Sequence, residues 1–347
     1  MAVIHMTEET KEALLELDEL KVYFYTEDGV VKAVDGVNLK VKKGEVVGLV
    51  GESGSGKTVT AMSILGLIPQ PPGKIVDGDI SYKGKSLVKM SESDMRSIRG
   101  NEIAVVFQDP MTSLNPVLSI GEQIAEAIRL HQQVDEIEAL EKTQTLLELV
   151  GIPDAGKRLD DYPWQFSGGM RQRVMIALAL SCNPDLLIAD EPTTALDVTI
   201  QAQVLDLMAS LKDKFDMSIL LITHDMGVIA GMADKVAVMY AGNIVEFSDS
   251  ISVFKKRKHP YTQGLLGAIP NMESKRDDDL MTIPGTIPNL ISPPNGCRFH
   301  PRCPKAVKEC SEVVPELIEE EPGHFVRCLL FGDQLEKYKS AQPLNTV

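Results

Sequence analysis

A glycine-rich loop between a strand and a helix constrains the fold of this chain most. The segment Gly51-Glu52-Ser53-Gly54-Ser55-Gly56-Lys57-Thr58 follows an apolar, strand-like run and opens a helix, which is the context that a phosphate-binding loop requires. Its glycines let backbone N–H groups turn toward phosphate oxygens, and the helix N-terminus adds partial positive charge. We expect Lys57 to reach the β and γ phosphates of a nucleotide and Thr58 to ligate Mg²⁺. A chance glycine-rich turn is the alternative that these flanks disfavour.

Two carboxylates follow a second apolar strand. The run Leu186-Leu187-Ile188-Ala189 ends in Asp190-Glu191. Asp190 is predicted to support Mg²⁺, and Glu191 is predicted to orient and deprotonate an attacking water. A strand followed by Asp-Glu is often only the start of a loop. Downstream of a phosphate-binding loop the pair is a much more specific signal of nucleotide hydrolysis.

A second helix start also offers donors to an anion. Ser167 caps the segment, and Gly168 and Gly169 follow it, so a hydroxyl and backbone N–H groups are presented together. A plain capped helix is the alternative interpretation of the same residues.

Strand-like and helical patterns alternate over most of the chain, which predicts an α/β sheet protein. The predicted strands are Ile103–Phe107, Leu186–Ala189, Ser218–Thr223 and Val236–Met239. Between Ile120 and Val150 the apolar spacing becomes helical, so we expect a mainly helical insertion. After Phe254 prolines and cysteines become frequent, and we place a second, smaller domain there.

Composition limits the partners of the chain. With 347 residues, 44% hydrophobic and 24% charged, the chain is long and apolar enough to bury a core. A net charge of −15 disfavours binding to nucleic acid or to an anionic lipid surface. Met1 to Leu20 does not resemble a secretory signal, and no apolar run approaches the ~20 residues that cross a bilayer. Any link to a membrane is therefore expected to go through another protein.

Taken together, these motifs resemble those of the ABC-transporter ATPases. The signature of that family appears here as Phe-Ser-Gly-Gly-Met-Arg-Gln-Arg, Phe166 to Arg173, with Met170 in place of the usual glutamine. The resemblance implies a P-loop NTPase fold with an ABC-type nucleotide-binding domain over residues 18–255. Its helical subdomain would cover about residues 109–182, and a small Cys-rich C-terminal extension would cover residues 256–347.

The resemblance also implies roles for residues between the motifs. Gln108 is similar to the glutamine that touches Mg²⁺ or its water and senses the membrane partner, and His224 to the switch histidine at the γ phosphate. Ala195-Leu196-Asp197 resembles the dimer-contact loop. Phe24, with Tyr25 as the alternative, is positioned like the aromatic that stacks on adenine.

Such ATPases work as head-to-tail pairs, so the family pattern places Ser167, Gly168 and Gly169 of one subunit on the ATP held by the phosphate-binding loop of the other. Catalysis would then be divided between two chains.

Further motifs narrow the resemblance to the ATPase subunits of dipeptide and oligopeptide importers. They are Asn115-Pro116, Gly121-Glu122-Gln123, His259-Pro260-Tyr261-Thr262 and Ile283-Pro284-Gly285. This resemblance covers about residues 18 to 330. It implies an ATPase that powers uptake of di- or oligopeptides from the cytoplasmic face of the cell membrane. The implied partners are a second ATPase subunit (a related protein or a copy of this chain), two membrane permeases and an external solute-binding protein. Import of nickel complexes or short oligosaccharides is the alternative within the same architecture.

Two other classes of ATPase fit less well. A chromosome-maintenance or repair ATPase would place a long coiled coil between Lys57 and Ser167, and the segment between them is too short for one. A translation-factor ATPase would carry two cassettes in tandem, whereas this chain contains one.

Four cysteines crowd the tail: Cys297, Cys303, Cys310 and Cys328. They lack the paired C-x₂-C spacing of structural zinc. Thiolates on irregular loops suit a 4Fe-4S cluster, and the segment Gly296 to Pro304 resembles family tails that hold one. Zinc and metal-free thiols remain the alternatives. Cys182 stands apart, and we expect it to be a buried small hydrophobe. Because every nucleotide motif lies before residue 225, ATP binding is expected to survive replacement of any one of the four tail cysteines by Ser.

Overall fold

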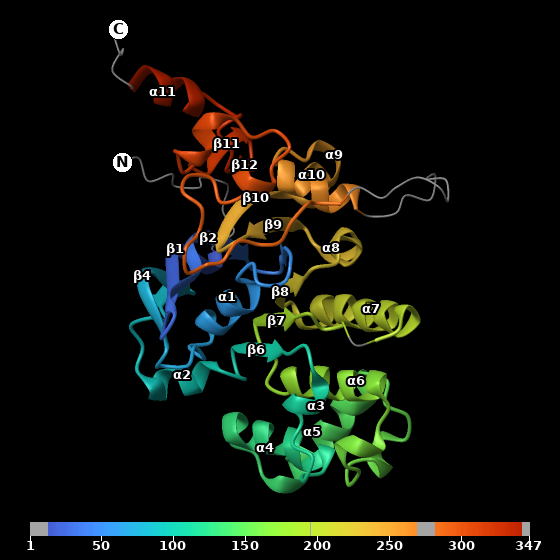
Figure 1. Cartoon of the computed structure of the whole chain (residues 1–347). Coiled ribbons are helices and arrows are strands. Elements are labelled where there is room, and N and C mark those ends of the chain that lie inside the picture. Colours follow the sequence, from blue (N-terminus) through green and yellow to red (C-terminus); the bar gives the residue numbers. More distant parts are fainter. Residues whose placement is uncertain (1–12, 195, 269–281, 342–347) are drawn as a thin grey trace, which may run out of the picture.

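The computed structural model describes residues 13–194, 196–268 and 282–341. Figure 1 shows a layered α/β body with a helical lobe at one end and the C-terminal segment at the other. The strands are β1 (Ala13–Thr26), β2 (Gly29–Lys42), β3 (Val46–Val50), β4 (Gly73–Tyr82), β5 (Lys85–Ser86), β6 (Ile103–Val106), β7 (Leu186–Asp190), β8 (Ser218–Thr223), β9 (Lys235–Tyr240), β10 (Asn243–Asp249), β11 (Ile318–Glu321) and β12 (His324–Val326).

The α-helices are α1 (Lys57–Ile64), α2 (Glu92–Ile98), α3 (Pro110–Ser113), α4 (Ile120–Gln132), α5 (Glu136–Leu149), α6 (Gly168–Ala179), α7 (Val198–Phe215), α8 (Met226–Met232), α9 (Ser250–Lys256), α10 (Pro260–Gly267) and α11 (Gln334–Ala341). Short 3₁₀ turns are η1 (Ala155–Lys157), η2 (Pro163–Gln165), η3 (His300–Arg302) and η4 (Lys308–Ser311). The predicted dimer-contact residue Ala195 lies outside the described residues.

The main sheet is mostly parallel and buried on both faces. Its strand order is β11-β12-β10-β9-β3-β8-β7-β6, and the five strands from β9 to β6 run parallel. Every residue of β3, β7 and β8 is buried, as expected when helices cover both faces of a parallel sheet. The predicted α/β alternation and the strands that carry the nucleotide motifs are confirmed.

An antiparallel sheet covers one side of this core. Its order is β2-β1-β4-β5. Val22 and Ile80 from this sheet share a buried cluster with Ile64 of α1 and with Leu49 and Ile188 of the main sheet. Helix α1, which follows the phosphate-binding loop, is thereby held between two sheets.

The predicted helical insertion forms the lobe at the bottom of Figure 1, where α3, α4, α5 and α6 lie together. Side chains cap these helices as the sequence pattern favours: Ser119, Asp135 and Ser167 each accept a hydrogen bond from a backbone N–H of the first turn. The apolar faces of α4 and α5 are buried in the same cluster as the inner side of the main sheet. The lobe is thus packed onto the sheet edge that carries β6 and β7.

The tail joins the main sheet instead of building a sheet of its own. Strand β12 pairs antiparallel with β10, with Glu246 opposite Val326 and Phe247 opposite Phe325. The rings of Phe247 and Phe325 also pack against each other in a tilted arrangement, with 6.2 Å between their centroids. The described part of the residues after Phe254 is therefore continuous with the main sheet through its backbone hydrogen bonds.

A fully buried carboxylate fixes this junction. Glu246 accepts hydrogen bonds from the backbone N–H groups of Lys258 (2.7 Å) and His259 (2.9 Å), and it lies 2.7 Å from Nε2 of His324. Burial alone would raise the pKa of Glu246, but the hydrogen bonds, headed by that from His324, outweigh burial and hold the pKa below its ordinary value. One side chain therefore ties β10, the start of α10 and β12 together.

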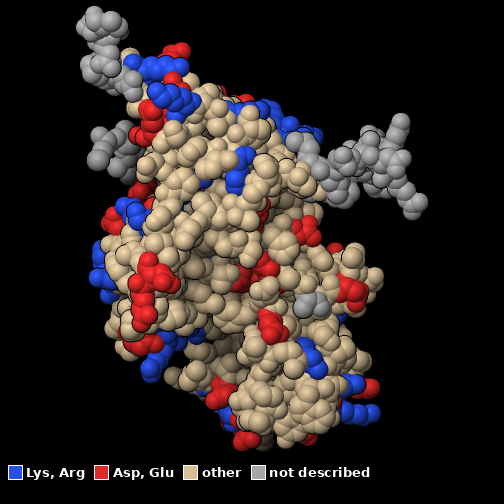
Figure 2. All heavy atoms as spheres, in the orientation of Figure 1, with Lys and Arg blue, Asp and Glu red and all other residues tan. Residues whose placement is uncertain are grey.

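Within the described residues no helix is both long and apolar enough to cross a membrane. On the face shown in Figure 2, Lys and Arg are dispersed among Asp and Glu and do not gather into a single basic patch.

We expect Glu246→Gln to lower the free energy of unfolding by about 3 kcal/mol, because the amide leaves a buried N–H donor unsatisfied at this junction. The measurement is the urea midpoint of the full chain. The exposed Glu320, on β11, supplies the control Glu320→Gln, which should leave the midpoint unchanged. An unchanged midpoint for Glu246→Gln would show that the junction contributes no stability.

Candidate functional site

The phosphate-binding loop requires its glycines for space. Gly56 adopts φ +110°, and a Cβ at this position would lie 2.4 Å from the carbonyl oxygen of Ala33. A Cβ on Gly51 would lie 2.2 Å from the carbonyl oxygen of Met239. Side chains at these positions would force the loop away from β2 and β9. The loop is therefore shaped by close backbone approach, as its sequence predicts.

The Lys57 ammonium lies inside the curve of this loop. Nζ donates to the carbonyl oxygens of Gly51 (2.8 Å) and Glu52 (3.1 Å), and the residue is only 5% exposed. Burial lowers the pKa of Lys57, and the carboxylates of Glu191 and Asp190 oppose that shift. A positive charge is thus held among backbone groups at the start of α1.

Asp190 offers an acceptor that no other described residue uses. It is 5% exposed, and its buried Oδ1 has no hydrogen-bond partner among the residues that the structure describes. Burial raises the pKa of Asp190, while a hydrogen bond from the Thr58 side chain lowers it. A buried carboxylate oxygen beside a threonine hydroxyl matches the oxygen donors that Mg²⁺ prefers. The residues therefore fit the metal that accompanies a bound nucleotide.

Two predicted catalytic side chains, Gln108 and His224, meet at the third, Glu191. Gln108 Nε2 donates to Glu191 Oε2 at 3.1 Å, and His224 Nδ1 lies 3.2 Å from Oε1. The Thr194 hydroxyl, which sequence reasoning missed, donates to Oε2 at 2.9 Å. The only sequence signal for Thr194 was its position three residues after Glu191. In the structure these residues form a turn, in which Thr194 N–H donates to the Glu191 carbonyl oxygen at 3.3 Å.

The backbone of Glu191 is strained. Its φ of +49° is in the left-handed region, which residues with a Cβ rarely adopt. Such strain is typical of catalytic and switch positions. Here it turns the carboxylate out of the end of β7 toward Gln108 and His224.

The signature helix starts in a different layer from α1. Ser167 caps α6 by accepting a hydrogen bond from Met170 N–H at 3.4 Å. Among the described residues, a Cβ on Gly168 would meet nothing within 4 Å, whereas one on Gly169 would lie 2.7 Å from Cγ2 of Ile200. Gly168 therefore faces open space, and Gly169 allows α6 to pack against α7. Figure 1 places α6 in the helical lobe and α1 against the antiparallel sheet.

The aromatic candidates differ in exposure. Phe24 is half-buried and packs against the core between the two sheets, while Tyr25 is 53% exposed. Of the two rings, that of Tyr25 is the more accessible. The stacking role predicted for Phe24 remains a prediction. Asp197, from the predicted dimer-contact loop, caps α7 by accepting from Ile200 N–H at 3.0 Å.

The tail reaches the phosphate-binding loop, which the sequence did not indicate. Arg302, 8% exposed, donates from Nη1 to Glu52 Oε2 (2.7 Å) and from Nη2 to Oε1 (3.1 Å). Glu52 N–H also donates to the Tyr261 hydroxyl at 2.9 Å. A bidentate arginine–carboxylate pair fixes both position and orientation. The tail therefore contacts the phosphate-binding loop directly, although every predicted nucleotide motif lies before residue 225.

The four tail cysteines lie in one small region. Cys310 and Cys328 are buried, Cys297 and Cys303 are partly buried, and Cys297 N–H donates to the Cys310 carbonyl at 2.8 Å. Burial, reinforced by the charges of the neighbouring thiols, raises the pKa of Cys328 to about 12 and that of Cys297 to about 11.

The predicted metal site at these cysteines is not supported by the structure. Among the described residues, no three His, Cys, Asp or Glu side chains are grouped so as to hold a metal ion. The reason is that the thiols come from separate turns and from the end of β12, and their burial favours the protonated form. Cys182 is partly buried, less than predicted, and its Sγ lies 3.6 Å from the Ala127 carbonyl oxygen.

Known proteins resemble this chain over most of its length. The family described as ABC transporter matches residues 34–194, and the oligopeptide/dipeptide transporter C-terminal region matches residues 245–310. A probable peptide ABC transporter ATP-binding protein of Sinorhizobium fredii is 51% identical, covering 91% of this chain and 94% of the relative. The oligopeptide transport ATP-binding protein AppD of Bacillus subtilis is 52% identical, with 92% and 98% covered.

Solved structures agree on the fold of the nucleotide-binding module. A dimeric structure of MJ0796, a bacterial ABC transporter cassette, has a TM-score of 0.61 and 25% identity. It covers 68% of this chain and 98% of the cassette. A dimeric post-hydrolysis state of the same cassette, bound to ADP and Pi, has the same similarity.

We expect Arg302→Gln to weaken ATP binding about tenfold, because it loosens the loop and leaves the Glu52 charge unpaired near the phosphates. Equilibrium binding of ATP to the full chain measures this. The double variant Glu52→Gln/Arg302→Gln should recover part of the loss. The control Lys305→Gln changes an exposed cation on the same segment. Equal affinity for Arg302→Gln and Lys305→Gln would mean that the pair does not position the loop.

Proposed function

This chain belongs to the family of ATP-binding subunits of oligopeptide and dipeptide ABC transporters, and from that membership we propose that its ATP hydrolysis powers the uptake of di- or oligopeptides. Two relatives whose names state peptide or oligopeptide transport match more than nine-tenths of the chain at about half identity. The match to the oligopeptide/dipeptide C-terminal region favours peptides over nickel complexes or short oligosaccharides. The observation that carries the motor role is the convergence of Gln108, Thr194 and His224 on Glu191.

In this proposal each motif binds or positions one part of the nucleotide. Backbone N–H groups of Gly51 to Gly56 and the Lys57 ammonium bind the phosphates, and Phe24 or Tyr25 stacks on adenine. Thr58, Gln108 and Asp190 hold Mg²⁺ directly or through water. Mg²⁺ supplies charge neutralisation at the transferred phosphoryl group.

Glu191 acts as the base for the attacking water in this scheme. Its carboxylate accepts from Gln108 and Thr194, so its orientation is set before a water arrives. Nδ1 of His224 lies 3.2 Å from the other carboxylate oxygen of Glu191, Oε1. We infer that His224 contacts the γ phosphate and reports its loss to the rest of the protein.

The second half of the site comes from another ATPase subunit. The open face at Gly168 and the capped start of α6 at Ser167 suit a nucleotide presented by a neighbouring chain. The dimeric cassettes with the same fold support a pair. The partner is a second copy of this chain or a related ATPase.

Membrane permeases are the other partners of an ABC importer ATPase. We propose that this chain sits on the cytoplasmic face of the cell membrane, bound to two permease subunits that receive peptides from an external solute-binding protein. The names of the relatives, which state peptide transport, support this arrangement.

We expect Glu191→Gln to lower ATP hydrolysis by ~10² to 10⁴ while ATP binding is kept, because the amide preserves shape and loses basicity. Phosphate release from the assembled transporter, together with ATP affinity, measures the two effects separately. Glu27→Gln, in the exposed β1–β2 turn, is the control. Hydrolysis within about threefold of the unmodified protein would exclude Glu191 as the base.

We also propose that Cys297, Cys303, Cys310 and Cys328 hold a 4Fe-4S cluster, with zinc as the alternative. The support is their common region and the mutual effect of their charges on the pKa of Cys328. Because the described side chains do not form a ligand set, binding would have to draw the thiols together.

Protein purified without oxygen should then contain about four iron atoms per chain and be brown. Replacing any one of the four cysteines by Ser should remove the iron, whereas Cys182→Ser should retain it. One tightly bound zinc per chain would reject the 4Fe-4S cluster and support the zinc alternative. A tail that is folded without any metal would reject both.

A further inference from the structure

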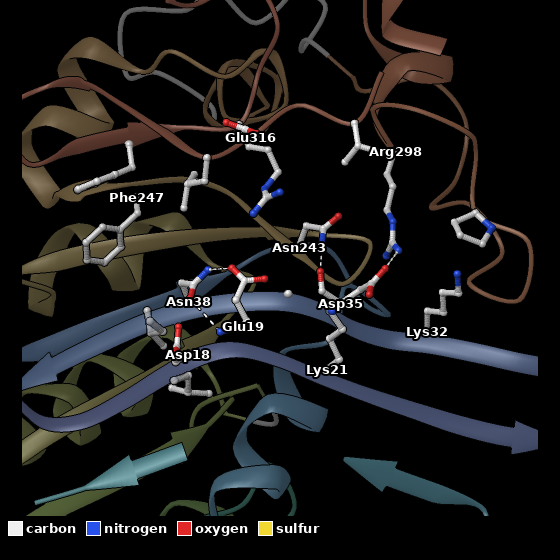
Figure 3. Close-up of a pocket in the computed structure, with 18 of the residues that line it drawn as sticks. Asp18, Glu19, Lys21, Lys32, Asp35, Asn38, Asn243, Phe247, Arg298 and Glu316 are labelled. Carbon is white, nitrogen blue, oxygen red and sulfur yellow. Dashed lines mark hydrogen bonds and ion pairs between the residues drawn. The ribbon is translucent and has the colours of Figure 1, made fainter. Parts of the chain in front are cut away.

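A large cavity lies between the antiparallel sheet and the C-terminal segment. Its volume is about 1120 Å³, and its lining includes none of the nucleotide-site residues described above. Figure 3 shows Asp18 and Glu19 of β1 and Asn38 of β2 on one side, with Glu316 and Arg298 from the C-terminal segment on the other. The volume is sufficient for a small molecule, since ligand sites in proteins occupy ~300–1,000 Å³.

The acidic side of this cavity is built by a distortion of β1. Glu19 adopts φ +45°, where the register of β1 with β2 shifts between Leu17 and Leu20. Glycines on the flanking strands, Gly36 and Gly78, have φ of +79° and +83°, and a Cβ on Gly78 would lie 2.4 Å from the Glu19 carbonyl oxygen. Strand bulges re-aim side chains. Three adjacent strands thus depart from regular geometry where the Glu19 carboxylate enters the cavity.

One oxygen of this carboxylate is available. Asn38 Nδ2 donates to Glu19 Oε1, and the Asn38 oxygen accepts from Glu19 N–H at 2.9 Å. Within the described residues, Glu19 Oε2 accepts no hydrogen bond and Glu19 forms no ion pair. Asn38 therefore orients the carboxylate while leaving an acceptor toward the cavity.

The opposite side presents a cation without a counterion. Arg327 donates from Nε to the Ile244 carbonyl (3.0 Å) and from Nη1 to the Pro315 carbonyl (3.2 Å), but it forms no ion pair in the described parts of the chain. Its neighbour Arg298 is paired with Asp35. Burial lowers the pKa of Arg327, and the charge of Glu19 opposes this shift. The two opposite charges therefore face one cavity without touching.

We propose that this cavity binds a small zwitterion, namely a free short peptide, with its carboxylate on Arg327 and its ammonium on Glu19. Carboxylate recognition by a planar guanidinium is strong and directional. Phe247, Phe325 and Leu317 also line the cavity and supply apolar contacts for a side chain. The choice of a peptide over other zwitterions rests on the proposed function. Such a site would let imported peptide bind the ATPase that drives its import.

The test is equilibrium dialysis of trialanine against the full chain, together with its N-acetylated and C-amidated forms. Free trialanine should bind saturably, and either modification should weaken binding at least about tenfold, the effect of losing one charged partner. Glu19→Gln should weaken binding of the free peptide and abolish discrimination against the acetylated form, while discrimination against the amide remains. If Glu19 were only structural, Glu19→Gln would change discrimination against the acetylated and the amidated peptide equally.

The other side of the cavity needs two variants, because Arg327 also bonds backbone carbonyls. Arg327→Lys keeps the charge and should weaken binding moderately, whereas Arg327→Gln should abolish discrimination against the amidated peptide. Glu320→Gln, outside the cavity, is the control.

Three outcomes would overturn the proposal: no saturable binding up to about 10 mM peptide, equal affinity for all three peptides, or displacement of the peptide by ATP. ATP binding and hydrolysis, measured on the same samples, report on the proposed function separately. A preparation that hydrolyses ATP but binds no peptide would remove the cavity proposal alone.

Discussion

The parallel register of β3, β8, β7 and β6 is the constraint on which the nucleotide site depends. Val50 lies opposite Thr223, Asp190 opposite Ile222, and Val106 opposite Ala189. Because parallel strands end at the same edge of a sheet, these pairings bring the phosphate-binding loop, the catalytic carboxylate and the residues after β6 and β8 to one line. A shift in register would separate Glu191 from both Gln108 and His224, although each motif would remain intact in the sequence.

The strands and motifs were predictable because their signals are local. Runs such as Leu186–Ala189 contain only apolar residues, which is typical of a strand buried on both faces. The glycines of the phosphate-binding loop also stand within a few positions before Lys57. The capped starts of α4, α5 and α6 follow from single Ser or Asp residues. In these segments the chain's local preferences and its packing agree.

The contacts that sequence reasoning missed join residues far apart in the chain. Arg302 and Glu52 are one arginine and one glutamate among many, and neither lies in a pattern that marks a partner. The pairing of β12 with β10 rests on three-residue and seven-residue strands, too short to indicate where they meet. The metal site predicted for the tail stays a prediction for a related reason, since cysteine spacing does not tell how turns orient their thiols.

The tail is attached to the nucleotide-binding module at several points. Lys32 N–H donates to the Leu290 carbonyl at 3.0 Å, Arg298 pairs with Asp35, and Arg302 pairs with Glu52. These attachments all fall on one short stretch of the chain, from β2 to the phosphate-binding loop. The C-terminal segment thus holds β2 and the phosphate-binding loop in place, and the cavity of Figure 3 lies between this segment and the antiparallel sheet.

The junction of β10 with β12 also has a consequence for synthesis of the protein. Strand β10 is complete at Asp249, but its partner β12 begins only at His324. While a ribosome adds the residues between them, one edge of the main sheet is unpaired, with Ile244 to Phe247 ready to pair with another chain. Unpaired edges are sites of misassembly in nascent proteins. A chain truncated before β12 would keep this edge of the sheet unpaired permanently. The tail therefore covers an edge that could associate with other chains, in addition to supporting the phosphate-binding loop.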